Sequence, residues 1–496
     1  MNYKAIFRVV SYALLLEAIC MIPGMLLCLM DGEPRVVLAY LAAIAVILAV
    51  SIPLYWQGKK APAAFYAQEG FVATSLAWIA LSMLGCLPFV FSGQIPSYVD
   101  AVFEMVSGFT TTGASILTDV EAMSRGLLLW RSFSHWLGGM GILVFLLAFT
   151  PTQSGGGHTM HLLRAESPGP SVGKLTPRLH QTAKILYILY FTLTVLDLVF
   201  LLLGGMPLFD ALCTAFGTAG TGGFGVKADS IAGYSPYLQN VTTVFMLLFG
   251  VNFTVYYLVL VRHTFSALLD EELRLYLAFF AGSTLLITWN VRGMYRTLGE
   301  TVRHAAFQVS SIMTTTGFAT TDFNLWPSFS KAIILMLMLL GACAGSTGGG
   351  LKMARVLLLL KDLRRSVRKS LHPNSVQVVQ VNGEALQEQV LRNTAAYLTA
   401  YCVLTLGSFL LVSLDGFSVE ANISAVFACF NNIGPGLAEV GPTSSFAAYS
   451  AFSKVILTMD MLFGRLEIFP MLFLFTPAAW KKAKRPRKNR MMGTLE

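Results

Sequence analysis

Charged residues are scarce in this chain, where Lys, Arg, Asp and Glu together make up 12 % of the 496 residues. A soluble domain carries about 25 % charged residues, so the composition excludes an ordinary soluble protein. Hydrophobic residues make up 55 % of the chain, and the mean hydropathy is +0.65. The composition therefore predicts an all-α polytopic membrane protein.

Signals of catalysis and of metal binding are also missing. The seven cysteines are scattered in or beside apolar runs without a CxxC spacing, which is typical of small buried side chains rather than of a disulfide or metal framework. The sequence contains no Walker motif, and its histidines lie in loops or singly near the ends of apolar runs. We therefore expect no enzyme and no nucleotide site in this chain.

The sequence is dominated by long apolar runs. A helix needs about 20 apolar residues to cross a bilayer, and ten such runs occur, at 7–30, 36–55, 71–93, 128–150, 184–204, 240–261, 273–291, 330–360, 393–414 and 450–477. The first run is expected to be a membrane span and not a cleaved signal, because another span follows at once. Lys and Arg gather in alternate loops, a positive-inside pattern that predicts cytoplasmic termini. This distribution explains the net charge of +9 without a nucleic-acid partner.

Four short polar segments interrupt the apolar pattern, and each ends on a glycine: Thr110–Gly113, Gly220–Gly223, Thr314–Gly317 and Asn431–Gly434. Rings of backbone carbonyls replace the hydration shell of a cation in ion selectivity filters, and glycine adopts the backbone angles that such loops need. The alternative is close helix packing through small residues. We predict a filter whose ion-binding residues are Thr111, Thr112, Gly113, Thr221, Gly222, Gly223, Thr315, Thr316, Gly317, Asn432, Ile433 and Gly434.

The four segments, which we call the filter segments, divide the chain into repeats. The first two apolar runs form a hairpin, and the other eight pair around one filter segment each. This predicts four M1–pore-loop–M2 repeats in a pseudo-fourfold arrangement. The expected divisions are an N-terminal transmembrane hairpin at 1–60, repeat 1 at 61–182, repeat 2 at 183–271, repeat 3 at 272–390, repeat 4 at 391–480 and a basic cytoplasmic tail at 481–496.

Local patterns add two predictions to this plan. Asp100 and Asp210 lie at the same distance before the filter glycines of repeats 1 and 2, so they are expected to cap the first turn of a pore helix. Residues 376–381 alternate apolar and polar side chains before Asn382-Gly383, which predicts a small β-hairpin in the cytoplasmic loop.

Several motifs resemble those of one transporter superfamily. Residues 110–114, 314–318 and 431–437 are similar to the filters of the Trk/Ktr/HKT potassium transporters, and 341–352 is similar to their intramembrane gating loop. The segments 372–374 and 461–467, together with the N-terminal hairpin, narrow the resemblance to the TrkH branch. The resemblance implies a homodimer in the bacterial inner (plasma) membrane that transports potassium and binds a TrkA-like cytoplasmic ring carrying the nucleotide sites. In the family a serine at the position of Gly113 accompanies Na⁺ selectivity, so Gly113 favours K⁺.

A glycine-rich run lies inside what is expected to be one crossing helix. Residues 341–350 include five glycines, and each glycine costs about 1 kcal/mol relative to alanine in a helix interior, so the helix is predicted to break here. Through the resemblance, a gate beneath the filter is expected at Gly345, Ser346, Thr347, Gly348, Gly349 and Gly350. A static kink is the alternative.

Ionisable residues within apolar runs are costly and are functional by default. Arg465 is one of them, and we expect it to complete the gate as an electrostatic barrier below the filter. The alternative is a structural pair with Asp460, Glu467 or a neighbouring helix. Glu17 and Asp197 are either proton-linked carboxylates or hydrogen-bonded structural groups.

These features favour potassium uptake through a selective, channel-like pore gated by the glycine loop and a regulatory partner. The alternative is a K⁺/H⁺ symporter that works by alternating access. Such transporters more often show two inverted repeats with broken helices, whereas four pore loops and one broken helix, in repeat 3, are expected here. The basic stretch 361–369 is expected to contact membrane lipid or the regulatory ring, or to be a solvated face.

Overall fold

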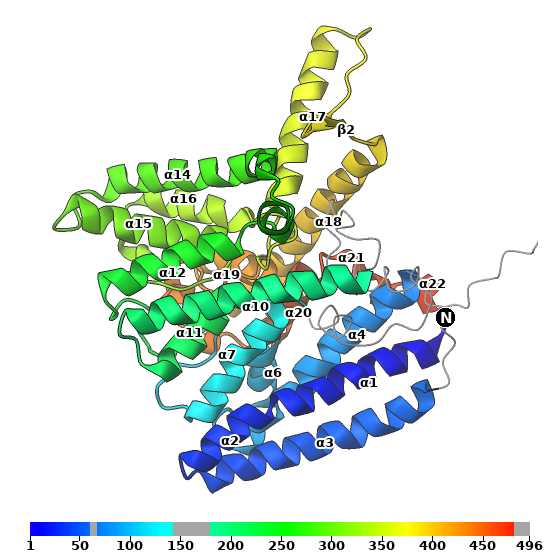
Figure 1. The fold of residues 1–496 in the computed structure, drawn as a ribbon, viewed down its shortest axis with the longest axis vertical. Helices are drawn as coiled ribbons and strands as arrows, with labels where there is room; N and C mark the ends of the chain where they lie inside the picture. The colour runs from blue at the N-terminus through cyan, green and yellow to red at the C-terminus, as the bar shows by residue number, and fades with distance from the viewer. Residues whose placement is uncertain (60–66, 142–178, 481–496) are drawn as a thin grey trace, which may run out of the picture.

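The N-terminal part of the chain is a helical hairpin. The computed structural model describes residues 1–59, 67–141 and 179–480. α1 (Tyr3–Cys20) continues as α2 (Ile22–Met30), and α3 (Pro34–Gly58) returns beside α1 (Figure 1). The Asn2 side chain caps α1, and Pro34 begins α3 at a position where a missing N–H is tolerated. The basic tail 481–496 and most of the polar insertion 151–182 lie outside the described residues.

The rest of the chain repeats one plan four times, with a first helix, a short pore helix and a second helix. The first helices are α4 (Ala67–Gly85) with α5 (Leu87–Phe91), α10 (Leu179–Leu203), α14 (Glu271–Val291) and α18 (Glu388–Val412). The pore helices are α6 (Tyr98–Phe109), α11 (Leu208–Gly220), α15 (Leu298–Met313) and α19 (Val419–Phe430). The second helices begin as α7 (Arg125–Gly139), α12 (Pro236–Phe249), α16 (Ser328–Leu339) and α20 (Ala451–Arg465). This is the predicted fold class.

The second helices stop beside the filter segments, and in repeats 2, 3 and 4 a further helix follows the break. α12 is bent by 91° from α13 (Phe253–Tyr256) and η1 (Tyr257–Val261). α16 is separated from α17 (Met353–Leu371) by residues 340–352. α20 is followed by α21 (Phe469–Phe475) after Glu467 and Ile468, which have φ angles of 53° and 67°.

The expectation of a single broken helix is therefore wrong. In repeat 2 the Asn252 side chain accepts a hydrogen bond from the Thr254 N–H (2.9 Å) and caps α13 as a new helix. Such a cap offers the backbone an alternative to continuing the old helix. In repeat 4 the break needs two consecutive residues with positive φ angles, one of them β-branched, which only the surrounding packing can hold.

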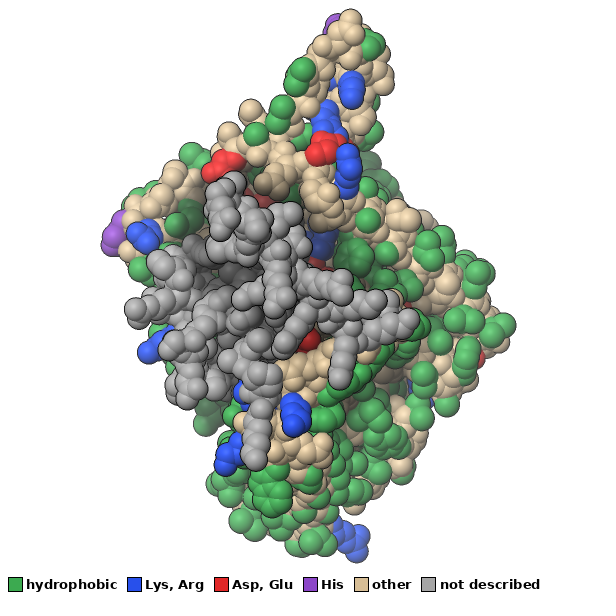
Figure 2. Space-filling view, turned by 90° about the vertical axis from the view of Figure 1, so that its right-hand side faces the viewer, with side chains coloured by type: hydrophobic (Ala, Val, Ile, Leu, Met, Phe, Trp, Pro, Cys, Tyr) green, Lys and Arg blue, Asp and Glu red, His purple; other side chains and the backbone are tan. Residues whose placement is uncertain are grey.

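The described helices are apolar enough for a multi-pass membrane protein. Five helical stretches can cross a membrane by length and composition, or six if the bent pair in repeat 2 is one span: 3–30, 34–58, 68–91, 183–203, 388–415 and 236–261. The other expected spans contain helices that are shorter, interrupted or less apolar, and part of the run 128–150 lies outside the described residues. Side chains such as Leu38, Trp56 and Leu410, which are 67 %, 72 % and 68 % exposed, face outward where lipid would lie. Figure 2 shows hydrophobic side chains gathered over the lower part of the molecule, around the N-terminal hairpin.

A projection formed by α17 and a β-hairpin rises from one end of the helical bundle (Figure 1). β1 (Gln380–Val381) pairs antiparallel with β2 (Glu384–Ala385) across the predicted Asn382-Gly383 turn, although the strand is shorter than the expected 376–381. The Asn382 side chain donates to Asp270 (2.6 Å) and accepts from the Glu271 N–H (3.0 Å), which fixes the hairpin to the start of α14. The remaining short elements are η2 (Phe265–Leu269), η3 (Phe323–Leu325), η4 (Ser413–Asp415), η5 (Ala438–Val440), η6 (Phe446–Ala448) and α22 (Pro477–Trp480).

The predicted capping by Asp100 and Asp210 is wrong. Ser97 caps α6 by accepting from the Asp100 N–H (3.4 Å), and α11 begins without a side-chain cap. The Asp100 carboxylate instead accepts from Lys454 (2.7 Å), and Asp210 accepts from the Tyr234 hydroxyl (2.7 Å). Both acids lie in the first helical turn, where negative charge is favourable, but their carboxylates bind neighbouring elements instead of free N–H groups.

Candidate functional site

All four pore helices end in the same backbone motif. The second residue of each filter segment is left-handed, with φ angles of 56°, 54°, 59° and 56° at Thr111, Thr221, Thr315 and Asn432. The N–H of the following residue bonds back to the carbonyl five positions earlier, at 2.8–2.9 Å in all four repeats. This is a Schellman motif, which usually places glycine at the left-handed position. Here β-branched threonine occupies it in repeats 1 to 3, so these three helix ends are strained, whereas the asparagine of repeat 4 tolerates the left-handed region.

The filter glycines close these four ends into a ring. Gly113, Gly223, Gly317 and Gly434 have φ angles of 81°, 74°, 87° and 98°, which favour glycine. A Cβ added to each would collide with a carbonyl oxygen of the next repeat. The oxygens are those of Gly222, Thr316, Ile433 and Thr112, for the four glycines in order. Each repeat therefore packs glycine against the backbone of its neighbour, and the fourth returns to the first.

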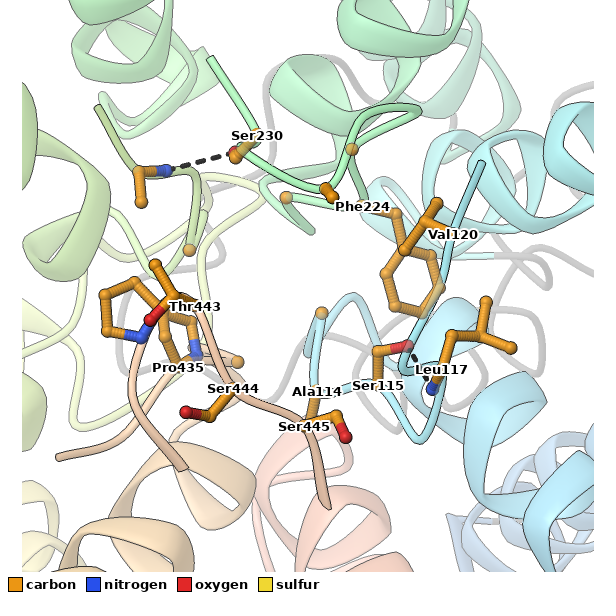
Figure 3. A pocket seen from close by; sticks show the side chains of 18 of the residues that line it. Ala114, Ser115, Leu117, Val120, Phe224, Ser230, Pro435, Thr443, Ser444 and Ser445 are labelled. Carbon is orange, nitrogen blue, oxygen red and sulfur yellow. Dashed lines mark hydrogen bonds between the residues drawn. The ribbon is translucent and has the colours of Figure 1, made fainter. Parts of the chain in front are cut away.

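A cavity of roughly 380 Å³ opens on one side of this ring (Figure 3). All four filter glycines line it, together with the segments that follow them. Figure 3 shows Ala114 and Ser115 of repeat 1, Phe224 and Ser230 of repeat 2, and Pro435 and Thr443 of repeat 4 around the opening. The cavity, which we call the vestibule, opens onto the ring and is lined by residues of every repeat.

Side chains behind the ring differ between repeats. In repeat 1 the hydroxyls of Thr110 and Thr112 lie 2.8 Å apart, and in repeat 3 those of Thr314 and Thr316 do the same. Asn432 replaces this pattern in repeat 4 by donating across the repeat boundary to the Thr112 hydroxyl (2.9 Å). The backbone of the ring is thus nearly fourfold, whereas its side-chain support is not.

Residues 340–352, which we call the glycine loop, fold into a closed excursion between α16 and α17. Its two ends are tied by bonds from the Gly341 N–H to the Leu351 carbonyl (2.8 Å) and from the Met353 N–H to the Ala342 carbonyl (3.0 Å). The Ala344 N–H donates to the buried Glu272 carboxylate (2.5 Å). The predicted helix break is confirmed, and the loop has a defined shape of its own.

The glycine loop contacts the ring at the end opposite to the vestibule. The Gly349 N–H donates to the Thr315 hydroxyl (2.7 Å), and a Cβ on Gly349 would lie 2.6 Å from the Asn431 carbonyl oxygen. Lys352, a residue that is only 9 % exposed, donates from its ammonium to the carbonyl of Gly348. The loop therefore touches repeats 3 and 4 of the ring and is held there by a buried cation.

Arg465 links the glycine loop to the other side of the ring. Its guanidinium donates to the carbonyl of Thr347 (3.0 Å) and the hydroxyl of Thr111 (3.3 Å). It also donates to the carbonyls of Gly139 (2.6 Å) and Gly138 at the end of α7. These contacts join repeat 4, repeat 1 and the loop through one side chain.

The carboxylates considered as partners of Arg465 have other contacts. Glu467 forms an ion pair with Arg355, and Asp460 accepts from the Ser408 hydroxyl (2.6 Å). Glu17 and Asp197 are buried, and Glu17 lies against Gly85 at the end of α4.

Several residues at the site were missed in the sequence, among them Arg131 on the vestibule wall, His135, Lys352 and Glu272. His135 stacks on Phe224 with ring centroids 4.1 Å apart and fills the space beside Gly222. Lys352 and Glu272 hold the glycine loop. The sequence did contain a signal for Lys352 and Glu272, because each is an ionisable residue in or beside an apolar run.

Known proteins resemble this chain over nearly its whole length. The TrkH family model, described as a cation transport protein, matches residues 38–482. The chain belongs to the TrkH family. It is 36 % identical over 493 residues to the Trk system potassium uptake protein TrkH of Salmonella typhimurium, covering 97 % of this chain and all of that one. It is 31 % identical over 487 residues to the Trk system potassium uptake protein TrkG of Escherichia coli, covering 97 % and 99 %.

A solved member of the TrkH family has the same fold. The crystal structure of the potassium transporter TrkH from Vibrio parahaemolyticus matches with a TM-score of 0.86 and 31 % identity, over 97 % of this chain and 100 % of that one. The resemblance inferred from the filter segments and the glycine-rich run is therefore confirmed at the level of the family.

Proposed function

We propose that this chain mediates potassium uptake by conducting K⁺ through the ring of filter segments. The observation that carries the proposal is the closed ring in which each filter glycine packs against a carbonyl of the next repeat. The TrkH and TrkG relatives, which are named as potassium uptake proteins, support K⁺ as the transported ion.

The physical chemistry of the ring suits a weakly hydrated cation. Four pore helices end at the ring, and the C-terminal end of a helix carries a partial negative charge. Backbone carbonyls held at fixed spacing replace the water that K⁺ sheds on entering. Gly113 keeps the Gly222 carbonyl in place because a larger residue would displace it. The uneven side-chain support predicts fewer ordered ion sites than a fourfold channel has.

The glycine loop is proposed to act as the gate, with Arg465 as its latch and barrier. The loop lies against the end of the ring opposite to the vestibule, where it obstructs an ion leaving the filter. Arg465 adds a positive charge at the same level. Opening requires the loop to release Thr315 and Arg465 together, which a partner acting on α17 is placed to promote because α17 continues directly from the loop.

The assembly is proposed from the family relationship and the charge pattern. The chain is expected to form a homodimer in the inner membrane with both termini in the cytoplasm. A TrkA-like nucleotide-binding ring is expected to bind the projection, and the basic stretch 361–369 of α17 contacts lipid or that ring. We propose no catalytic activity and no nucleotide site for this chain itself.

A K⁺/H⁺ symporter is the second candidate. The breaks in the second helices of repeats 2 and 4 favour it, because broken helices near the midplane are frequent in alternating-access transporters. The closed ring favours the channel, since all four repeats contribute equivalent backbone to one opening.

Ion flux in liposomes tests the proposed function. The purified chain is reconstituted, and K⁺, Rb⁺ and Na⁺ fluxes are measured with and without the regulatory ring, at equal and at unequal pH across the membrane. A channel gives K⁺ flux that exceeds Na⁺ flux and does not need a pH gradient. Flux driven by the pH gradient would identify the symporter, and equal K⁺ and Na⁺ flux would contradict a potassium filter.

A further inference from the structure

A buried ion pair lies at the vestibule wall. Glu104 on α6 and Arg131 on α7 are 0 % and 3 % exposed, and the Arg131 Nε atom lies 2.6 Å from the Glu104 Oε1 atom. Removing two charges from water is expensive, and their attraction offsets that cost only when further hydrogen bonds complete the geometry. The additional contacts of this pair therefore indicate what it holds in place.

Glu104 holds the segment that follows the repeat 1 filter. Its carboxylate accepts from the Ser115 hydroxyl (2.9 Å and 3.1 Å, one to each oxygen) and from the Ile116 N–H (2.9 Å). Ser115 comes two residues after Gly113, so these bonds fix the direction in which the chain leaves the ring.

Arg131 holds the equivalent segment of repeat 2. Its guanidinium donates to the Gly225 carbonyl (3.2 Å) and lies 3.5 Å from the centroid of the Phe224 ring. Phe224 and Gly225 directly follow the filter glycine Gly223. Arg131 and Phe224 both line the vestibule, and Figure 3 shows the Phe224 ring on its wall.

The other pore helices use uncharged groups at the same height. Thr214, Gln308 and Ala425 occupy the position of Glu104, nine residues before the filter glycine. The Gln308 amide donates to Thr321 of its own repeat (3.2 Å), and the neighbouring Ser424 accepts from Leu437 of its own repeat (2.8 Å). Among these contacts, the charged pair differs because it joins two adjacent repeats.

We propose that Glu104 and Arg131 are specificity-determining positioning residues that brace the filter corners of repeats 1 and 2 against each other. The pair sets the spacing between the chains leaving Gly113 and Gly223, and Glu104 neutralises a cation that lines the vestibule. The inference rests on the proposed function, because it assigns the pair a role in the selectivity of that same pore.

The test is the K⁺/Na⁺ flux ratio of reconstituted variants of the full chain. A ratio does not depend on how much protein is active, so a loss of folded protein alone leaves it unchanged. Glu104→Gln is expected to lower the ratio by about tenfold, equivalent to about 1.4 kcal/mol. The double variant Glu104→Gln/Arg131→Gln no longer has an unpaired cation at the vestibule, but it still lacks the brace. Its K⁺/Na⁺ flux ratio is therefore expected to stay low.

Glu420→Gln is the matched control. Glu420 pairs with Lys331 (3.3 Å) between α19 and α16, but both side chains are partly exposed, and the control is expected to keep the wild-type ratio. Arg131→Lys preserves the charge but cannot reproduce the fork that reaches both Glu104 and Gly225, so a smaller fall is expected.

The outcomes separate the brace from the proposed function. A wild-type K⁺ preference that survives in Glu104→Gln overturns the brace and leaves the pore intact. If Glu104→Gln does not fold, Arg131→Lys and Glu104→Asp are judged by the same ratio, and wild-type values in both overturn it. A wild type without K⁺ preference overturns the proposed function and the brace with it.

Discussion

Truncating Arg465 to alanine is expected to release the glycine loop and raise K⁺ flux in the absence of the regulatory ring. The side chain bonds the loop at the Thr347 carbonyl (3.0 Å) and the filter at the Thr111 hydroxyl (3.3 Å). Alanine removes both contacts and the positive charge, while Lys352 and Thr315 continue to hold the other part of the loop.

The expected rise in K⁺ flux can be worked out from the hydrogen bond between Arg465 and the Thr347 carbonyl alone. A hydrogen bond with one charged partner contributes about 1.5–3 kcal/mol, and each 1.4 kcal/mol changes an equilibrium about tenfold. Losing the bond to Thr347 therefore shifts the ratio of open to closed loop by about 10- to 150-fold. Where the closed loop dominates, flux rises by a similar factor.

Rb⁺ or K⁺ uptake into liposomes measures this change, with protein amount normalised by the folded fraction. Arg465→Lys separates the two roles proposed for the side chain. It keeps the barrier charge and loses the guanidinium fork, so a latch predicts raised flux and a pure barrier predicts wild-type flux.

Arg125→Ala is the control. Arg125 forms an exposed ion pair with Asp31, with 3.1 Å between the guanidinium nitrogen and the carboxylate oxygen, and such a pair contributes little to stability. Flux in Arg465→Ala that stays at the wild-type level, in protein that folds normally, refutes the latch. Loss of expression or of dimer assembly would point to a structural role.

Two further changes test neighbouring parts of the account. Deleting residues 345–349 removes the loop's bonds to Thr315 and Arg465, so K⁺ flux in liposomes is expected to rise and to lose its dependence on the partner; flux that remains fully regulated would count against a gate. Glu467→Gln leaves Arg355 buried without its counter-ion. Breaking such a pair costs about 3–5 kcal/mol, so thermal unfolding in detergent is expected at a clearly lower temperature, and an unchanged midpoint would show that the pair is not needed for stability.

The parts of the structure that rest on local rules could be predicted from the sequence. A glycine three or four residues after the end of a short apolar helix predicted each filter segment, because left-handed backbone favours glycine at that point. The Asn382-Gly383 turn was predicted for the same reason. The break at 341–350 followed from the cost of clustered glycines.

The parts that rest on distant partners could not be predicted. The breaks after α12 and α20 depend in part on contacts with other repeats, such as the bond from the Phe253 N–H to the Gly345 carbonyl (3.1 Å). Asp100 failed as a cap because Lys454, at the far end of the chain, binds its carboxylate. No spacing rule indicates that Arg465 meets Gly139, or that Glu104 and Arg131 join two filter corners.

The K⁺/Na⁺ flux ratio of Gly113→Ser, measured beside the wild type in the same liposomes, tests the ring most directly. Gly113 has a φ angle of 81°, and a Cβ there would collide with the Gly222 carbonyl oxygen. Serine must therefore displace one of the four carbonyls of the ring. We predict that the variant loses preference for K⁺ and moves toward Na⁺. An unchanged ratio with normal flux would contradict the assignment of the four filter segments as the potassium filter.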